Sequence, residues 1–240
     1  MLEISSYFDP NLRKKIKQKK LVAVIPVGSI EQHGAHLPIS TDSDIVSEVT
    51  KRVAQKKRFL LLPTITFGVS YEHAPFFNLS IKQSTLKAIL IDLCESLLSN
   101  GINTVFVING HHGNQKPIKN LNEKLRKLSK NKLNVFPLSY WHFMKRDFDH
   151  AGFVETSLML VISKNVKMNL AKKGLITKGM NKKELENIGR LASKSFPKVT
   201  KNGVWGDPTK ASKKEGQKIL DEIVENISKK CQTCLTGHSS

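Results

Sequence analysis

Short apolar runs alternate with longer amphipathic stretches along the chain, and this pattern predicts its secondary structure. Four runs rich in valine, isoleucine and leucine predict strands. They lie near residues 21–27, 59–65, 102–108 and 133–138. Elsewhere apolar residues recur at the helical period. The predicted helices lie near residues 44–56, 82–100, 115–130, 155–164, 183–195 and 209–229. Alternating strands and helices are typical of an α/β protein with a mostly parallel sheet and helices on both faces.

The length and composition are consistent with one domain over residues 1–240. A chain of 240 residues, of which 39% are hydrophobic, can bury a large core. No internal repeat, low-complexity tract or linker divides it. A lysine-rich stretch from residue 164 to residue 183 is expected to form a surface excursion.

The sequence favours a cytoplasmic protein. No apolar run approaches the roughly 20 residues of a membrane span, and no charged-then-apolar leader with a cleavage site is present. The three cysteines do not form a disulfide framework. Cys231-x-x-Cys234 with His238 lacks a fourth ligand for a zinc knuckle, so we expect a frayed tail there. Cys94 lies in an apolar helical pattern and is expected in the core.

A dense group of metal-binding side chains follows the first of these predicted strands. The segment 28–38 contains Glu31, His33 and His36, and Asp42 comes just after it. On an extended chain, residues two apart face the same side, so Glu31 and His33 can point at one spot. Carboxylate and imidazole together suit zinc, manganese or iron. Polar residues after a strand also form plain solvated loops, and this segment alone does not decide between the two.

Two later segments carry the same residue types. The predicted strand at 102–108 ends in Asn-Gly-His-His-Gly-Asn at 109–114, and residues 147–157 contain His150 and Glu155. Ligand sites in open α/β sheets gather beyond the carboxyl ends of strands, which brings these segments together. Six of the eight histidines lie in or next to the three segments, at positions 33, 36, 111, 112, 142 and 150. Histidines without a common task would be more scattered, so we predict one shared site.

Four motifs occur in the order typical of the creatininase (creatinine amidohydrolase) family, which the chain resembles over nearly its whole length. They are Val27-Gly28-Ser29-Ile30-Glu31-Gln32-His33-Gly34, Leu37-Pro38 followed by Thr41-Asp42, Asn109-Gly110-His111-x-Gly113-Asn114, and His150-Ala151-Gly152-x-x-Glu155-Thr156-Ser157. The resemblance continues through the segment 203–208 and the helix after it. It implies a three-layer αβα fold with a mostly parallel central sheet, and a homo-oligomer that is often a hexamer.

The resemblance also implies two divalent metal ions per subunit, which are zinc, manganese or iron. Asp42 matches the aspartate that bridges the two metals. Glu31 and His111 match ligands of one metal, and His33 matches a ligand of the other. His150 matches a catalytic histidine that is expected to move protons.

One position departs from the family's pattern. Creatininase proper has a glutamate two residues after the histidine of the Asn-Gly-His motif, and this chain has Gly113 there. The second metal therefore needs another carboxylate. Glu155 is the best candidate, both as a ligand and as a catalytic group. The departure also weakens the case for creatinine as the substrate.

Amide hydrolysis at such a site has clear chemical requirements. An amide is a poor electrophile and neutral water is a poor nucleophile. Two metals about 3.5–4 Å apart address both, because they polarise the carbonyl and lower the pKa of water. The leaving nitrogen then needs a proton, which a histidine titrating near neutrality can deliver. We expect His150 to take this role, with a structural loop histidine as the alternative.

Several neighbouring residues have weaker expected roles. His36 and His112 each lie next to a predicted ligand and are expected to face the substrate or to support the ligands. Glu72 and His73 lie on a loop that resembles the family's substrate-side loop, although solvated residues are nearly as common there. Asp44 is expected to be the N-cap of the helix that follows it.

The net charge of +19 allows three interpretations. Lysines recur through nearly every predicted helix, which favours a solvated basic surface. Such charge also attracts nucleic acid, but the chain has no helix-turn-helix, zinc-finger or RNP-like signature, so we expect no nucleic-acid partner. The third interpretation is attraction of a small phosphorylated substrate. Lys145 and Arg146 precede the His150 segment, and Arg146 is the predicted phosphate contact.

The sequence thus predicts a dinuclear metal-dependent amidohydrolase that cuts a non-peptide C–N bond in a small molecule. Gly113 and the basic surface favour deformylation of a phosphorylated formylaminopyrimidine, a reaction of riboflavin and deazaflavin synthesis, over hydrolysis of creatinine. The family's peptide-trimming branch is a further alternative. The chain has neither of the glycine-rich motifs that bind nucleotides.

Overall fold

A computed structural model describes residues 2–237 of the chain. Its five strands are all parallel and form one sheet in the order β1-β3-β2-β4-β5. The strands are β1 (Leu2–Glu3), β2 (Ala23–Val27), β3 (Leu60–Leu61), β4 (Thr104–Asn109) and β5 (Asn134–Ser139). The register pairs Val27 with Asn109 and Asn109 with Ser139, so the carboxyl ends of β2, β4 and β5 lie level.

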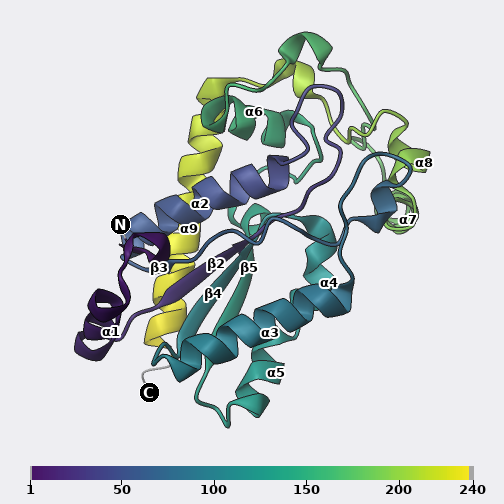
Figure 1. The fold of residues 1–240 in the computed structure, drawn as a ribbon. Coiled ribbons are helices and arrows are strands. Elements are labelled where there is room, and N and C mark those ends of the chain that lie inside the picture. Colours follow the sequence, from purple (N-terminus) through teal and green to yellow (C-terminus); the bar gives the residue numbers. More distant parts are fainter. Residues whose placement is uncertain (1, 238–240) are drawn as a thin grey trace.

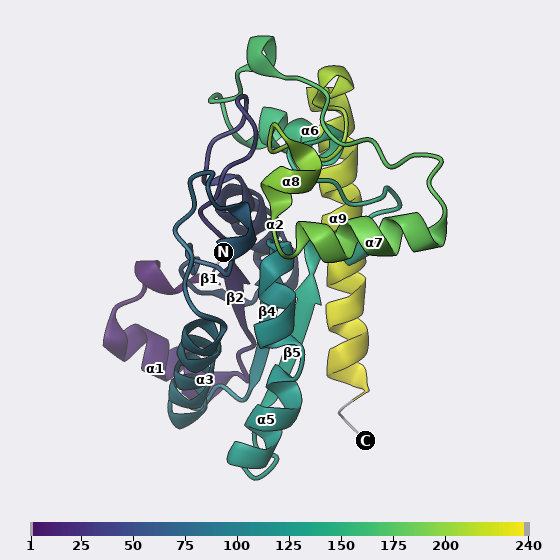
Figure 2. The same cartoon turned by 90° about the vertical axis from the view of Figure 1, so that its right-hand side faces the viewer.

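Helices cover both faces of this sheet (Figures 1 and 2). The longer ones are α1 (Asp9–Gln18), α2 (Thr41–Lys57), α3 (Gln83–Ser99), α5 (Leu121–Leu128), α6 (Phe153–Ile162), α7 (Lys182–Ala192) and α9 (Lys213–Thr236). Two are short, α4 (Gln115–Ile118) and α8 (Phe196–Thr200). Val24 and Phe106 pack with α2, α6 and α9, whereas Ile25 and Val105 pack with α3 and α5 on the other face. The predicted three-layer αβα architecture is confirmed.

The edge of the sheet differs from the prediction. The strand expected at 59–65 is only Leu60–Leu61, because Pro63 has no N–H to donate to a neighbouring strand. The apolar pattern does not predict β1 or α1, and α1 buries no residue. The helix expected at 115–130 is two helices, since Asn120 between them leaves the helical region (φ −110°, ψ 24°).

α2 begins at Thr41, earlier than expected, and this changes the roles of two aspartates. Ser40 precedes the first turn, and its carbonyl oxygen accepts the N–H of Asp44 at 2.8 Å. The Ser40 hydroxyl also donates to Asp44 Oδ2 at 2.8 Å. The expectation that Asp44 is the N-cap is therefore wrong. Asp42 lies in the first turn of α2.

The C-terminal segment is helical and packed. α9 runs to Thr236 and buries Cys231 completely. The expectation of a frayed tail is therefore wrong for the residues up to Thr236. His238 lies outside the described residues. Cys94 is fully buried in the core, as expected. Over residues 2–237, no helix has the length and apolarity needed to cross a membrane.

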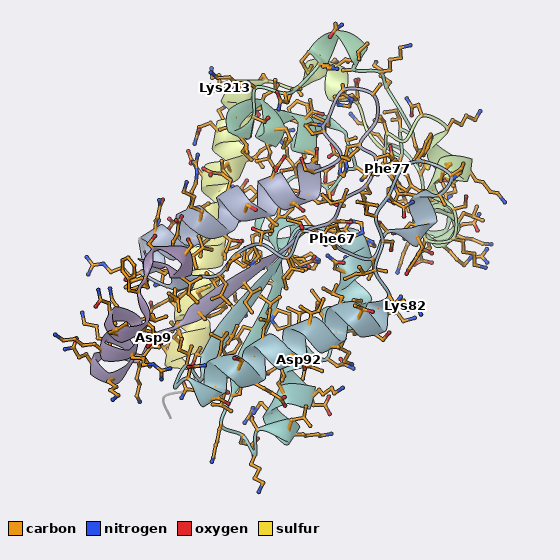
Figure 3. The ribbon with its side chains drawn as sticks, in the orientation of Figure 1. Asp9, Phe67, Phe77, Lys82, Asp92 and Lys213 are labelled. Atoms are coloured by element: carbon orange, nitrogen blue, oxygen red, sulfur yellow. The ribbon has the colours of Figure 1, made fainter. Side chains whose placement is uncertain are left out.

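Basic side chains are spread over the molecule. Figure 3 shows side chains that end in nitrogen around its whole outline, with Lys82 and Lys213 far apart. Two exposed aromatic side chains, Phe67 and Phe77, lie on the segment between β3 and α3. The distribution of nitrogen-tipped side chains fits a solvated basic surface better than a single basic patch.

Candidate metal centre

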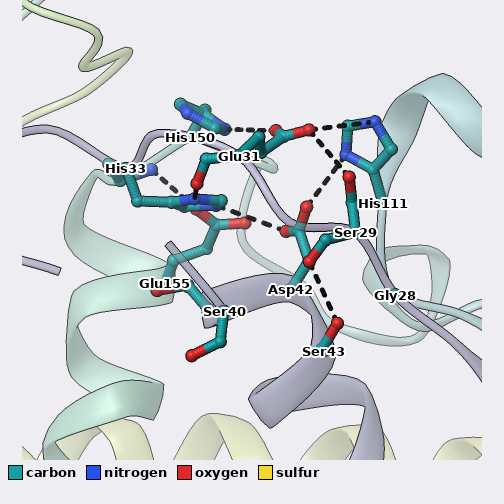
Figure 4. A network of polar contacts seen from close by, with 12 residues as sticks. Gly28, Ser29, Glu31, His33, Ser40, Asp42, Ser43, His111, His150 and Glu155 are labelled. Carbon is teal, nitrogen blue, oxygen red and sulfur yellow. Dashed lines mark hydrogen bonds and ion pairs between the residues drawn. The ribbon is translucent and has the colours of Figure 1, made fainter. Parts of the chain in front are cut away.

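Five ionisable side chains converge just beyond the carboxyl ends of β2 and β4 (Figure 4). Glu31 and His33 come from the loop after β2, and Asp42 comes from the first turn of α2. His111 follows β4, and Glu155 lies in the first turn of α6. Each is at most 4% exposed. The structure therefore brings together all five side chains expected as metal ligands.

The five side chains form two groups that share one residue. His33 Nε2 lies 3.3 Å from Asp42 Oδ1 and 3.5 Å from Glu155 Oε2. Asp42 Oδ2 lies 2.9 Å from His111 Nδ1, and Glu31 Oε2 lies 3.3 Å from His111 Nε2. Within each group, one ligand atom per residue lies within 4.8 Å of the others. Asp42 is thus the residue common to both groups.

Unpaired buried atoms show that the cluster suits metal ions. Glu31 Oε1, His33 Nε2, Asp42 Oδ2 and Glu155 Oε1 are buried and make no well-formed hydrogen bond among the described residues, although the first three lie within 3.3 Å of an imidazole or carboxylate atom. A buried polar atom without a partner costs about 1–3 kcal/mol. Cations bound between these carboxylate and imidazole donors would remove that cost, and the donor types suit zinc, manganese or iron.

Backbone contacts orient the two histidines of the cluster. His33 Nδ1 lies 3.1 Å from the carbonyl oxygen of Glu31, and His111 Nε2 lies 2.8 Å from that of Val69. When each of these nitrogens donates its proton to the carbonyl, the other ring nitrogen is left as a free electron-pair donor facing Asp42. This arrangement is usual for metal-binding histidines.

The carboxylates control the protonation of these histidines. Burial lowers the pKa of His33, but Asp42, Glu155 and Glu31 together outweigh it and raise this pKa to about 10. Burial likewise lowers the pKa of His111, and Glu31 and Asp42 raise it to about 10. Burial raises the pKa of Asp42, yet the two imidazoles hold it well below its usual range. Without metal, the cluster is therefore held by imidazolium–carboxylate pairs.

Metal uptake is expected to release protons at neutral pH. His33 and His111 hold protons in the metal-free protein, since each pKa is raised to about 10. Both must lose a proton to bind metal, so affinity should fall steadily as the pH drops below that value. Calorimetric titration of Zn²⁺ in two buffers of different ionisation enthalpy measures the release. Identical heats in both buffers would contradict it.

Two further imidazoles flank Glu31. His150 Nδ1 lies 3.9 Å from Glu31 Oε1, and His150 Nε2 lies 3.1 Å from the carbonyl oxygen of Gln32. His73 Nε2 lies 3.1 Å from Glu31 Oε1, and the side-chain amide of Gln32 donates to His73 Nδ1 at 3.0 Å. His73 Nε2 is therefore placed within ion-pair distance of Glu31 and helps to orient it. Sequence reasoning misses this contact.

A cavity of about 490 Å³ adjoins the cluster. Glu31, Asp42, His111 and His150 line it, together with residues from α3, α4, α7 and α8. Glu72 and His73 line it as well, so the loop expected on the substrate side does reach this cavity. A substrate in the cavity would therefore contact both the cluster and His150.

Of the three residues expected to contact the substrate, His112 lines the cavity and the other two do not. His36 is 1% exposed, and its Nε2 pairs with Thr156 Oγ1 at 2.9 Å, which ties it to α6. Arg146 Nη2 pairs with Glu215 Oε2 at 2.8 Å, at the start of α9. Neither side chain is placed as a substrate contact, because each is engaged away from the cavity.

Gly113 occupies a position with no room for a side chain. A Cβ there would lie 2.0 Å from the carbonyl oxygen of Val69 and 2.6 Å from His111 Nε2. A glutamate at this position would therefore force the backbone apart. Glu155 is the carboxylate that the second group contains instead.

Asn114 connects the loops around the site. Its Oδ1 accepts the N–H of Val69 at 2.9 Å, and its Nδ2 donates to the carbonyl oxygen of Gly28 at 2.9 Å. Asn109 Oδ1 accepts the N–H of His111 at 3.1 Å. These bonds fix the loops after β2 and β4 against each other.

Most of the chain matches one protein family. The model of creatininase, creatinine amidohydrolase, matches residues 9–231. A mycofactocin precursor peptide peptidase from Mycobacterium ulcerans is 32% identical over 215 residues, which cover 85% of this chain and 81% of that protein. A 2-amino-5-formylamino-6-ribosylaminopyrimidin-4(3H)-one 5'-monophosphate deformylase from Methanocaldococcus infernus is 29% identical over 227 residues, 89% of this chain and 92% of that protein. A solved structure of creatininase with Mn is 22% identical, with a TM-score of 0.78 over 95% of this chain and 96% of that one.

The fold and these matches define a hydrolase that acts on carbon–nitrogen bonds. The chain belongs to the creatininase family. The relatives act on different substrates, so family membership fixes the class of reaction and not the molecule that is cut.

Proposed function

We propose that this protein is a dinuclear metal-dependent amidohydrolase in which Asp42 bridges two divalent ions. Glu31 and His111 would hold one ion, and His33 and Glu155 would hold the other. The observation that carries the proposal is that two three-residue donor groups share Asp42. The unpaired buried donor atoms and the manganese in the related creatininase support it.

The chain's own residues would divide the work of hydrolysis. Bound metal ions would supply a polarised carbonyl and a more acidic water. Burial, followed by the nearby His33 and His73, lowers the pKa of His150 and keeps its ring neutral. A neutral ring can accept a proton and then deliver it to the leaving nitrogen. His73 would hold Glu31 in position throughout.

We propose further that the amide is the formamide of a phosphorylated formylaminopyrimidine. The relative from Methanocaldococcus infernus, which is named for that reaction, aligns with nearly all of this chain. Phe148, Phe196 and Trp205 line the cavity, and aromatic walls suit a flat heterocycle. Gly113 is a further difference from creatininase proper, which argues against creatinine.

An activity screen of the metal-reconstituted protein tests this function. We expect formate release from the formylaminopyrimidine ribotide, with kcat/KM about 100-fold or more above that for creatinine or a short peptide. Protein stripped of metal is the control and should be inactive. Preferential cleavage of the peptide or of creatinine would replace the substrate assignment. No hydrolysis of any amide by protein with both metals bound would contradict the amidohydrolase itself.

A further inference from the structure

One part of the cavity wall is a helix face made of small residues. Gly189, Ala192 and Ser193 line the cavity at and just after the end of α7. Glycine is unfavourable inside a helix, and Gly189 has no packing reason to be there, since a Cβ would meet no atom within 4 Å. Gly189 is exposed and lines the cavity, so the open space beside it lies where the cavity meets solvent.

Two aromatic rings line the same cavity as this face of α7. Phe196 and Trp205 line the cavity with ring centroids 6.4 Å apart and ring planes inclined by 26°. The ring of Phe196 also lies 4.6 Å from that of His73, which contacts the cluster. Phe196 and Trp205 thus form an apolar wall, the ring seat, that continues to the end of the cavity next to the metal cluster.

Lys116 of α4 is exposed and is the one lysine or arginine that lines this cavity among the described residues. Its ammonium makes no ion pair with a described residue, whereas Lys127 and Lys218 each pair with a glutamate. Gln83 and Gln115 line the same cavity, and their carboxamides bond to no other side chain in the described part of the chain. A free cation with free amide donors favours a negatively charged group.

The carboxylates of the cavity are engaged elsewhere. Glu31 and Asp42 belong to the candidate metal cluster. Asp149 Oδ2 accepts the N–H of Val154 at 2.9 Å, at the start of α6. Glu72 Oε1 lies 3.1 Å from the position of a Cβ on Gly113, beside the cluster. None of these four carboxylates forms an ion pair with Lys116 in the described part of the chain.

We propose that Gly189 and Lys116 set the substrate specificity of the enzyme. The cavity takes an amide whose nitrogen carries a flat ring with an anionic substituent: the ring lies against the glycine of α7, and the anion pairs with Lys116. The inference rests on the proposed function for the reacting group. It assigns the recognition of the anion to Lys116 and not to Arg146, which pairs with Glu215.

Lys116→Gln tests the anion contact, with Lys119→Gln as the matched control, because Lys119 is also exposed, lies three residues further along and does not line this cavity. KM for the formylaminopyrimidine ribotide should rise about 10–100-fold in Lys116→Gln, the range for a hydrogen bond to a charged group. KM for the dephosphorylated ribonucleoside should change little, and Lys119→Gln should leave both values unchanged. Equal effects of Lys116→Gln on the two compounds would overturn the anion contact.

Substitutions at Gly189 test the ring seat. Gly189→Leu should abolish turnover of the ribotide and spare that of N-methylformamide, which carries no ring. Lys183→Leu is the matched control, because Lys183 is exposed on the same helix and lies outside the cavity lining, so turnover of the ribotide should be unchanged. Normal turnover of the ribotide by Gly189→Leu would overturn the seat.

Binding separates this inference from the proposed function. The ribotide can be titrated into metal-free protein, where no hydrolysis is expected. Weaker binding by Lys116→Gln than by Lys119→Gln supports the anion contact even if the loaded enzyme cuts no formamide. Equal binding by the two variants overturns the contact even if the loaded enzyme is an active deformylase.

Discussion

An Asp42→Ala variant is expected to lose most of its bound metal and, with it, amide hydrolysis. Asp42 is the residue shared by both donor groups, so its removal takes one ligand from each ion. It also leaves His33 and His111 without the carboxylate that they both face. Metal affinity should fall by more than about 100-fold, beyond the loss typical of a residue that only supports a ligand. Elemental analysis after dialysis measures the metal content.

Asp44→Ala is the matched control for this experiment. Asp44 lies in the same turn of α2, but its carboxylate accepts a hydrogen bond from Ser40 and belongs to neither donor group. The variant should keep both metals. Full metal content in Asp42→Ala would reject the bridge. Glu155→Ala gives an intermediate test, because it should lose one ion and keep the other.

A His150→Ala variant is expected to keep its metal while turnover falls about 10²–10⁴-fold, the usual contribution of a positioned acid or base. The two donor groups are complete without His150. Its ring nevertheless lies at the cavity, with Nδ1 3.9 Å from Glu31 Oε1. Paired measurements of metal content and kcat distinguish a proton carrier from a ligand.

His142→Ala controls for loss of an imidazole, since His142 is exposed and outside the cavity lining. It should leave both metal content and kcat unchanged. His150 also forms a third potential donor group with Glu31 and His33. Loss of one metal ion from His150→Ala would therefore make it a ligand. Near-normal turnover would reject His150 as the proton carrier.

The central part of the fold was predictable because its strands are buried on both faces. β2 and β4 are continuous apolar runs, as expected for parallel strands between two helical layers. β1 is a two-residue strand and is too short to carry a pattern, and β3 was predicted from its apolar run but is shorter than expected. The start of α2 was misplaced because Ser40, not the aspartate of the first turn, precedes the helix.

In the candidate site, residues close together in the sequence were predictable, whereas contacts between residues far apart in the sequence were not. Glu31 and His33 were predictable from their spacing on one loop after a strand. The positions of His36 and Arg146 could not be predicted, because their side chains bond to residues 120 and 69 positions away in the sequence. His73 was expected only on a substrate-side loop, since its contact with Glu31 depends on the path of that loop. Motifs located the site, and packing decided which neighbours face it.

The tight fit around Gly113 has an evolutionary consequence. A glutamate cannot replace this glycine in one step, because its Cβ would overlap the carbonyl oxygen of Val69 and crowd a ring nitrogen of His111. A lineage that exchanged glycine and glutamate at this position would first have to shift the loop that carries Val69. Asn114 binds that loop, so its contact would have to change as well. The exchange would therefore need several coordinated mutations, and intermediates with only one of them would be expected to fold poorly.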